Sequence, residues 1–323
     1  MPSLADTLAG IILAALTAYV LLGGADFGGG VWDLLASGPR KARQRDLIAH
    51  AIGPVWEANH VWLILAIVLL FTCFPRAFAT IAVGLHVPLT LMLIGIVLRG
   101  SAFVFQSYGG GGGRVFATAS LVTPVLVGMC VGAVASGTVW LGVRDAYGSF
   151  VTSFIRSWFT PFGFAVGIFT LVCFAFLAAV YLTVESKDAE LQEDFRRRAI
   201  ASGAAVFAIA VVGLAVFPEA PSVNEWVVAL TAIAALGALW SLWRRRYEWA
   251  RIAAAAQVAL IVWGWGIAQY PYLLPPDLTI AAAAAPRITL ELALIAVVAG
   301  AIVLFPSLYY LMKVFKGKSF KNS

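Results

Sequence analysis

A succession of long apolar runs, separated by short polar stretches, constrains this chain more than any other feature. A helix needs about 20 apolar residues to cross the ~30 Å of hydrocarbon in a bilayer. Because lipid cannot hydrogen-bond to the backbone, unbroken runs of this length must be helical. The alternating pattern of about ten residues that marks a membrane barrel is absent. The sequence therefore predicts an all-α, polytopic membrane protein with about nine transmembrane helices, at residues 8–36, 49–73, 77–105, 115–140, 160–185, 199–217, 224–243, 250–270 and 287–312.

Composition excludes the soluble alternatives. Of the 323 residues, 12% are charged and 62% are hydrophobic, whereas about a quarter of an ordinary soluble domain is charged. A soluble globule could not supply a polar exterior from so few charged residues. The net charge of +6 does not indicate nucleic acid, because the basic residues form short clusters between apolar runs, as in loops that face anionic lipid.

The positions of these basic residues predict an orientation. Lys and Arg concentrate in the cytoplasmic loops of membrane proteins. With the N-terminus outside, 18 of the 22 Lys and Arg residues fall on inside segments, which supports nine spans with the N-terminus out and the C-terminus in. The inside residues are Arg40, Lys41, Arg43, Arg45, Arg99, Arg114, Lys187, Arg196, Arg197, Arg198, Arg244, Arg245, Arg246, Arg251, Lys313, Lys316, Lys318 and Lys321, and the outside residues are Arg76, Arg144, Arg156 and Arg287.

The short stretches between spans leave no room for an extramembrane domain, so we predict one integral membrane domain over residues 1–323. Residues 1–145 and 146–275 would form two four-helix bundles, with the last helix, 287–312, packed outside them as a peripheral helix. The three cysteines lie in or at the ends of apolar runs and lack paired metal-ligand spacing, so we predict no metal site.

Four ionisable residues inside the predicted spans are candidates for function, because charge is costly in hydrocarbon. Asp26 and Glu57 each lie about eight to ten residues from the inner ends of adjacent antiparallel spans, which predicts both carboxylates ~12–15 Å inside the inner face. His60 lies one turn deeper than Glu57, and His86 reaches a similar depth from the outside. Carboxylates and imidazoles suit proton transfer near neutral pH, so these four residues predict a proton pathway.

Other interpretations remain open. Asp26 could cap the helix backbone in its glycine-rich segment, and Glu57 and His60 could form a structural polar cluster with Asn59. His86 could bond a carbonyl freed by Pro88. A stand-alone, proton-coupled secondary transporter would also suit buried acids and a glycine-broken helix. The chain could also be an assembly subunit without a proton role.

Three segments resemble subunit II of the cytochrome bd-type quinol oxidases, which includes the cyanide-insensitive oxidase subunit II proteins. Residues 22–30 (LGGADFGGG) are similar to the family signature D-G-F-D-L-G-x-G, and residues 51–64 (AIGPVWEANHVWLI) to I-x-P-x-W-[DE]-x-N-x-V-W-L. Residues 98–103 (LRGSAF) resemble the L-R-G-x-x-F end of the third span. The structural positions of these motifs are Gly28, Gly30, Trp56, Asn59, Trp62, Arg99 and Gly100.

The chain departs from the family pattern at two places. Gly23 replaces the first acid of D-G-F-D, and Val104 and Gln106 replace an acid and a base often found around Phe105. One relay acid of the family is thus missing, and the proton route could run through His60 or through the partner.

The resemblance implies the non-haem subunit of a heterodimeric quinol:O2 oxidoreductase in a prokaryotic cytoplasmic (inner) membrane, with no catalytic residue in this chain. The larger subunit I of such oxidases carries haems b and d and the quinol site, and the electrogenic reaction reduces dioxygen to water with cytoplasmic protons. The resemblance further implies that subunit II supports the haem subunit, and that Asp26 and Glu57 match carboxylates of a proton path. Quinol and lipid contacts, a structural quinone and a small accessory single-span subunit are further expectations.

Overall fold

The computed structural model describes residues 3–52, 56–107, 112–144, 155–217 and 224–317. Within these ranges, nine helices are long and apolar enough to cross a membrane, which confirms the predicted all-α, polytopic architecture. These helices are α1 (Leu4–Leu34), α3 (Trp56–Cys73), α5 (His86–Ser107), α6 (Gly113–Ala135), α8 (Pro161–Glu185), α9 (Ala189–Val216), α10 (Glu225–Trp243), α11 (Tyr247–Gln269) and α13 (Arg287–Gly317). The shorter elements are α2 (Lys41–Ile52), α4 (Pro75–Gly84), α7 (Val139–Arg144), α12 (Ile280–Ala283) and the antiparallel pair β1 (Tyr272–Leu274) and β2 (Leu278–Thr279).

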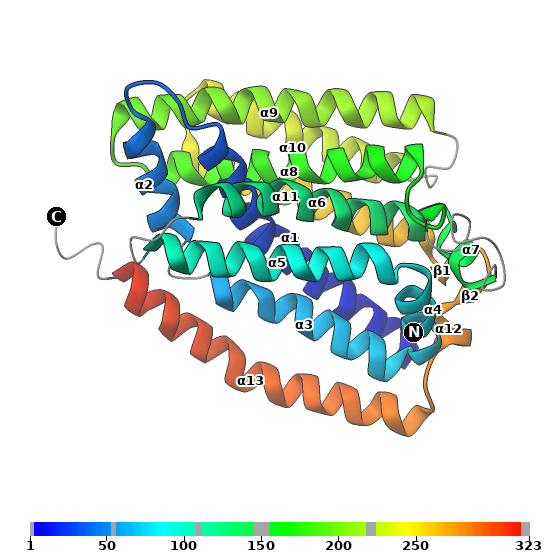
Figure 1. Cartoon of the computed structure of the whole chain (residues 1–323). Helices are drawn as coiled ribbons and strands as arrows, with labels where there is room; N and C mark the ends of the chain where they lie inside the picture. Colours follow the sequence, from blue (N-terminus) through cyan, green and yellow to red (C-terminus); the bar gives the residue numbers. More distant parts are fainter. Residues whose placement is uncertain (1–2, 53–55, 108–111, 145–154, 218–223, 318–323) are drawn as a thin grey trace.

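The long helices lie side by side along one axis (Figure 1). The helix α2, the α8–α9 turn and the C-terminal end of α13 gather at one end, which we call the basic end because it holds Arg40–Arg45 and Arg196–Arg198. The N-terminus, α4, α7 and the small β pair lie at the opposite end. The molecule thus separates its clustered positive charges from its N-terminus by the length of the bundle.

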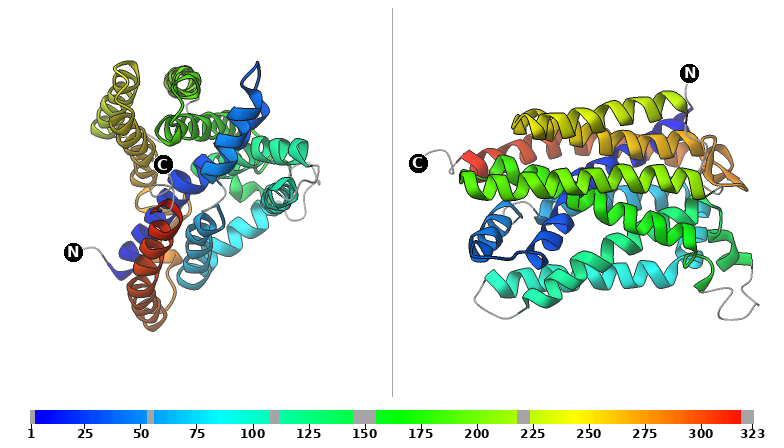
Figure 2. Two further views of the ribbon diagram at one scale, coloured as in Figure 1. Left: turned by 90° about the vertical axis from the view of Figure 1, so that its left-hand side faces the viewer. Right: turned by 90° about the horizontal axis from the view of Figure 1, so that it is seen from above.

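Two helices form the centre of the packing. Helix α1 packs against α3, α6, α8 and α11, and end-on it crosses the middle of the bundle (Figure 2). Helix α8 packs against α1, α6, α9 and α11, and its residues Phe174, Phe176 and Leu177 are fully buried. Helix α13 is the least buried span, with 6% of its apolar window buried against 61% for α6. Functional groups on α1 are therefore held by the best-packed part of the chain.

Helix starts follow local capping chemistry. At the start of α1, the Ser3 hydroxyl accepts a hydrogen bond from the Asp6 backbone N–H, while the Asp6 carboxylate accepts from the Ser3 N–H. This reciprocal box satisfies two of the backbone donors that every helix start leaves free. Helices α8 and α9 have simpler caps, in which one side-chain oxygen accepts one backbone hydrogen bond. The Thr160 hydroxyl caps α8, and the Asp188 carboxylate caps α9.

The predicted span 77–105 is not one helix. It divides into α4 and α5 at Leu85, three residues before Pro88. A proline cannot donate a hydrogen bond, and its ring clashes with the carbonyl four residues earlier, here that of Gly84. The residue predicted to enter the membrane deeply, His86, is instead the first residue of α5.

The predicted span 49–73 also begins too early. Residues 41–52 form the separate helix α2, which runs across the basic end, and α3 begins at Trp56. Helix α2 has few apolar residues and buries only Gln44, Ile48 and Ile52. The polar sequence KARQRD explains this placement, because such a segment is costly in hydrocarbon and stable at its edge.

The division into bundles 1–145 and 146–275 stays a prediction, and its boundary lies outside the described residues. Residues 53–55 of the second motif, with Pro54, and the basic residues Lys318 and Lys321 also lie outside them.

Candidate functional site

A buried carboxylate on α1 is the centre of the candidate site. Asp26 is 5% exposed, and its Oδ2 accepts a hydrogen bond of 2.8 Å from the Asn59 side-chain amide on α3. This contact joins the first and second motifs, through two residues that are 33 positions apart in the chain. A carboxylate at this depth requires such polar partners, because burial of an uncompensated charge is costly.

Arg99 on α5 supplies the positive charge of the site. Its Nη2 donates a hydrogen bond of 3.0 Å to the backbone carbonyl of Asp26, and the side chain is 2% exposed. Its guanidinium carbon lies 4.7 Å from the ring centre of Phe27 and 5.3 Å from that of Phe116. Aromatic faces stabilise a desolvated cation. The three motifs therefore meet at one place, with Asp26, Asn59 and Arg99 at its centre.

The role of Arg99 could not be deduced from the charge pattern. The positive-inside pattern assigns Arg99 to an inside segment, whereas the structure places it within α5, beside Asp26. The usable signal was its position inside an apolar run, in the motif L-R-G-S-A-F. The clusters Arg40–Arg45 and Arg196–Arg198 still lie at the basic end.

His60 lies next to this centre, between aromatic rings. It is half-buried, and its Nδ1 donates a hydrogen bond of 2.9 Å to the Trp56 carbonyl, which leaves Nε2 as the acceptor nitrogen. Its ring contacts Tyr19 edge-on at 5.8 Å and Trp56 at 6.2 Å. The Nε2 of His60 and the hydroxyl of Tyr19 are both buried without a hydrogen-bond partner. The sequence did not single out Tyr19, which carries no motif.

The structure does not bring Glu57 and His86 into this centre. Glu57 lies in the first turn of α3, and its side chain is exposed on the outer surface of the bundle. Its predicted depth came from a span starting at residue 49, and that start is not observed. His86 is exposed at the far end of α5, where its Nδ1 bonds the Val83 carbonyl at 2.9 Å. Of the four predicted residues, only Asp26 and His60 belong to this region: Asp26 accepts a hydrogen bond from Asn59, and His60 is the next residue on α3.

The glycines of the first motif allow close packing around Asp26. A Cβ added at Gly28 would lie 2.0 Å from the backbone oxygen of Phe174 on α8, and one at Gly30 would lie 2.1 Å from Ser120 Oγ on α6. These positions hold α1 against two helices at distances that no side chain permits. The glycines thus fix where Asp26 stands.

The remaining motif residues also pack. Trp56 contacts Phe103 at 6.1 Å, and a Cβ added at Gly100 would meet the Trp56 ring at 3.0 Å. Trp62 contacts Phe305 of α13 at 6.3 Å. The third motif is therefore locked onto the second by an indole ring.

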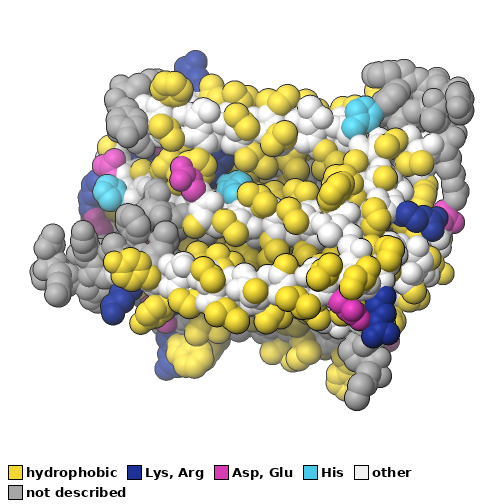
Figure 3. Space-filling view, turned by 90° about the horizontal axis from the view of Figure 1, so that it is seen from below, with side chains coloured by type: hydrophobic (Ala, Val, Ile, Leu, Met, Phe, Trp, Pro, Cys, Tyr) yellow, Lys and Arg dark blue, Asp and Glu magenta, His cyan; other side chains and the backbone are white. Residues whose placement is uncertain are grey.

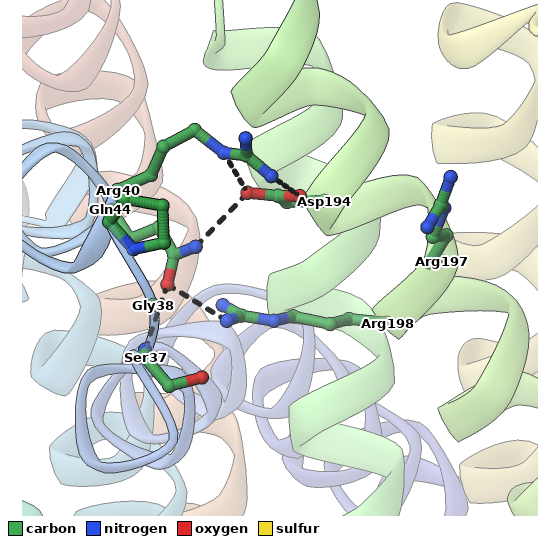
Figure 4. Close-up of a pocket in the computed structure, with 8 residues that line it drawn as sticks. Ser37, Gly38, Arg40, Gln44, Asp194, Arg197 and Arg198 are labelled. Carbon is green, nitrogen blue, oxygen red and sulfur yellow. Dashed lines mark hydrogen bonds and ion pairs between the residues drawn. The ribbon is translucent and has the colours of Figure 1, made fainter.

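At the basic end, ion pairs tie α2 to α9 (Figure 4). The guanidinium of Arg40 donates two hydrogen bonds to Asp194, of 2.8 and 2.6 Å, and the Gln44 amide donates a third of 3.0 Å. Arg198 donates to Gln44 at 2.9 Å, and Arg43 pairs with Asp188. Arg40, Gln44, Asp194 and Arg198 border a pocket of about 290 Å³. The network holds α2 across the end of α1.

No group of three or more His, Cys, Asp or Glu residues that could hold a metal ion occurs among the described residues. Around Asp26, the described residues supply carboxylate, amide, imidazole, hydroxyl and guanidinium groups. Carboxylates and imidazoles can carry protons near neutral pH.

The fold and site define a multi-pass α-helical membrane protein with a buried, charged centre between its first three spans. A family model, cytochrome bd terminal oxidase subunit II, matches residues 4–315. The chain therefore belongs to the subunit II family of the cytochrome bd terminal oxidases, and it is a multi-pass bacterial membrane protein. Members of this family are subunits of quinol oxidases that reduce dioxygen.

Individual relatives agree with this family. The chain is 22% identical to the putative cytochrome bd menaquinol oxidase subunit II of Bacillus subtilis, over 94% of this chain and 93% of that protein. It is 31% identical to the cytochrome bd ubiquinol oxidase subunit 2 of the same organism over 33% of this chain, and 26% identical to the cytochrome bd-I ubiquinol oxidase subunit 2 of Escherichia coli over 54%. Those two matches cover 31% and 47% of the relatives' own lengths.

A chain in the structure of the bd oxidase from Geobacillus thermodenitrificans has the same fold. The TM-score is 0.70 at 22% sequence identity, over 97% of this chain and 98% of that one. The likeness extends over all nine candidate spans.

Proposed function

We propose that this chain is the non-haem subunit of a heterodimeric quinol:O2 oxidoreductase, and that it supports a haem-bearing subunit I and conducts protons toward it. The observation that carries the proposal is Asp26, a carboxylate buried between three spans, with one hydrogen bond from Asn59 and the guanidinium of Arg99 beside it. Reduction of dioxygen to water consumes protons. A carboxylate in the membrane interior suits their delivery.

The side of proton entry follows from the charges. The basic clusters and the α2 helix lie at the end opposite the N-terminus (Figure 1). Under the positive-inside rule, this basic end faces the cytoplasm and the N-terminus is outside. Asp26 lies eight residues before the end of α1, which places it about 12 Å from the cytoplasmic end of the helix.

The surface over α3 and α5 is where we place subunit I. Figure 3 shows this face as largely hydrophobic, with an acidic and a histidine side chain set among hydrophobic ones. Glu57 is exposed on α3, and a carboxylate facing lipid is costly. A covering partner removes that cost. The exposed hydrophobic residues of this face include Ile64, Ile67, Val68, Phe71, Leu93, Ile94 and Val97.

Proton flow then has a direction. From Asp26, the route passes the Asn59 amide, which hydrogen-bonds the carboxylate without carrying the proton, and reaches His60 and Glu57 at or near the surface given to the partner. In this proposal, haems b and d belong to subunit I, and this chain is not expected to ligate a haem. The resemblance to the family also implies a structural quinone and a small accessory subunit. This proposal assigns no residue of this chain to either of them.

Replacing Glu57 with glutamine is expected to slow quinol-dependent oxygen consumption by about tenfold or more, as loss of a positioned proton carrier does. Assembly should survive, because the glutamine is equal in size and the side chain packs against nothing within this subunit's core. Oxygen consumption and haem content of the purified complex measure the two effects separately.

Glu291→Gln is the matched control, since Glu291 is an exposed glutamate paired with Arg287 at the outer end of α13. Its activity should equal that of the wild type. Full activity of the Glu57→Gln complex at normal haem content would remove Glu57 from the proton path and leave the subunit assignment standing.

A further inference from the structure

Asp26 shares its side of α1 with a second buried acid. Asp26, Gly30 and Asp33 are spaced by four and three residues, and this spacing places them on one face of the helix. Asp26 is 5% exposed and Asp33 is 4% exposed. Seven residues correspond to about 10 Å along the axis. Because Asp33 is the penultimate residue of α1, this face leads from the basic end to Asp26.

A hydroxyl from another helix lies between the two acids. Gly30 has no side chain, and the space that its Cβ would take is filled by Ser120 of α6, whose Oγ would lie 2.1 Å from that atom. Ser120 is fully buried, and its hydroxyl has no hydrogen-bond partner. Pro124, four residues later in α6, cannot donate the usual helix hydrogen bond to the Ser120 carbonyl. The Ser120 hydroxyl thus stands beside the midpoint of the Asp26–Asp33 interval.

Asp33 is in turn connected to the surface. Its Oδ1 lies 3.4 Å from Nε of Arg45, and the same guanidinium donates two hydrogen bonds of 3.3 Å to the Asp33 backbone oxygen. The Arg45 side chain is 39% exposed. The second carboxylate oxygen, Oδ2, is buried and has no partner. The other charged group near Asp33 is Lys41, also on α2.

We propose that Asp33 is the proton-entry residue of this subunit and that the Ser120 hydroxyl passes the proton to Asp26. This inference rests on the proposed function, in which Asp26 lies on the proton path. Each interval is about one helical turn, 5–6 Å between side-chain positions, which one bridging water spans.

The transfer is balanced in protons and involves no electrons. Asp33 takes a proton from cytoplasmic water and becomes a neutral acid. It then releases that proton toward the Ser120 hydroxyl, which accepts it on a lone pair while releasing its own proton toward Asp26. Asp33 returns to its charged form beside Arg45, and Asp26 carries the proton.

The test uses the whole complex, purified with its haem subunit, carrying Asp33→Asn or Ser120→Ala. The fully reduced enzyme is mixed with oxygen, and proton uptake from the medium is followed with a pH-indicating dye. Each variant is expected to slow proton uptake by about tenfold or more and to enlarge the solvent isotope effect in D2O. Haem content and the KM for quinol should not change, since neither residue is near the partner-facing surface.

Conservative variants separate a proton role from a structural one. Asp33→Glu and Ser120→Thr keep the titrating or hydroxyl group and should retain most of the uptake rate. Asp46→Asn, an exposed acid on α2, is the matched control and should have no effect. If Asp33→Asn also lowers the haem content, a structural effect of that change would slow uptake as well. The proton-uptake rate of Ser120→Ala then tests the proposal.

Asp26→Asn and Glu57→Gln are measured in parallel. Slow uptake in those variants with normal uptake in both Asp33→Asn and Ser120→Ala would overturn this inference and leave the proposed function intact. Normal uptake in all four would overturn the proposed proton path itself and the entry route with it.

Discussion

Replacing Arg99 with methionine is expected to destabilise the complex by about 3–5 kcal/mol, the cost of leaving one member of a buried charged pair without the other. Asp26 would keep its hydrogen bond from Asn59 and lose the guanidinium that hydrogen-bonds its backbone carbonyl and interacts electrostatically with its carboxylate. Methionine fills a similar space between Phe27 and Phe116, so packing alone would not account for such a loss. The thermal midpoint of the purified complex and the yield of assembled, haem-containing oxidase measure it.

Two further variants define the cause. The double change Arg99→Met with Asp26→Asn leaves no uncompensated charge and should recover most of the lost stability, while proton uptake stays slow. Arg114→Met, at an exposed arginine at the start of α6, should change the thermal midpoint little. Equal thermal midpoints for wild type and Arg99→Met would show that Asp26 is not held by this arginine.

A single methyl group at Gly28 is the second large effect that we expect. The added Cβ would lie 2.0 Å from the Phe174 backbone oxygen and 2.8 Å from the Ala178 Cβ. Neither atom can rotate away, so α1 and α8 must separate, at a cost of about 1–3 kcal/mol or more. Because Asp26 is two residues away, the separation should also reduce oxidase activity. Thermal unfolding and oxygen consumption of the Gly28→Ala complex check both effects.

The same helix offers the matched control. Gly10 lies in α1 with nothing within 4 Å of its added Cβ. Alanine there should be neutral or should stabilise by up to about 1 kcal/mol, since it reduces backbone freedom in a helix. Similar destabilisation by Gly10→Ala and Gly28→Ala would mean that the effect comes from helix composition and not from contact with α8.

The number and type of long elements could be predicted from the sequence because the physics of lipid makes length and hydropathy decisive. Nine apolar runs predict nine spans, and the described residues contain nine candidates. The starts of the second and third spans were less accessible to that reasoning, because the structure begins them at Trp56 and His86. Their breaks depend on local features, namely the polar run at the start of α2 and the two prolines Pro75 and Pro88.

The candidate site was predictable only in part, for a related reason. Asp26 and Asn59 are polar residues inside apolar runs, and such residues stand out in sequence. Arg99 also lies in an apolar run but near its predicted end, where a positive charge is common, so its burial depended on tertiary packing. Ser120 and Tyr19 carry no charge and no motif, and only the fold places Ser120 beside Gly30 and Tyr19 beside His60. Their roles are set by neighbours from distant parts of the chain.

The central claim is that this chain works as the non-haem subunit of a quinol oxidase. The most direct test is to purify the tagged chain from its native membrane in mild detergent and record its reduced-minus-oxidised visible spectrum. We predict haem bands together with a larger co-purifying subunit, and quinol-dependent oxygen consumption by the preparation. A haem-free chain without a partner, under conditions that preserve other membrane complexes, would contradict the account.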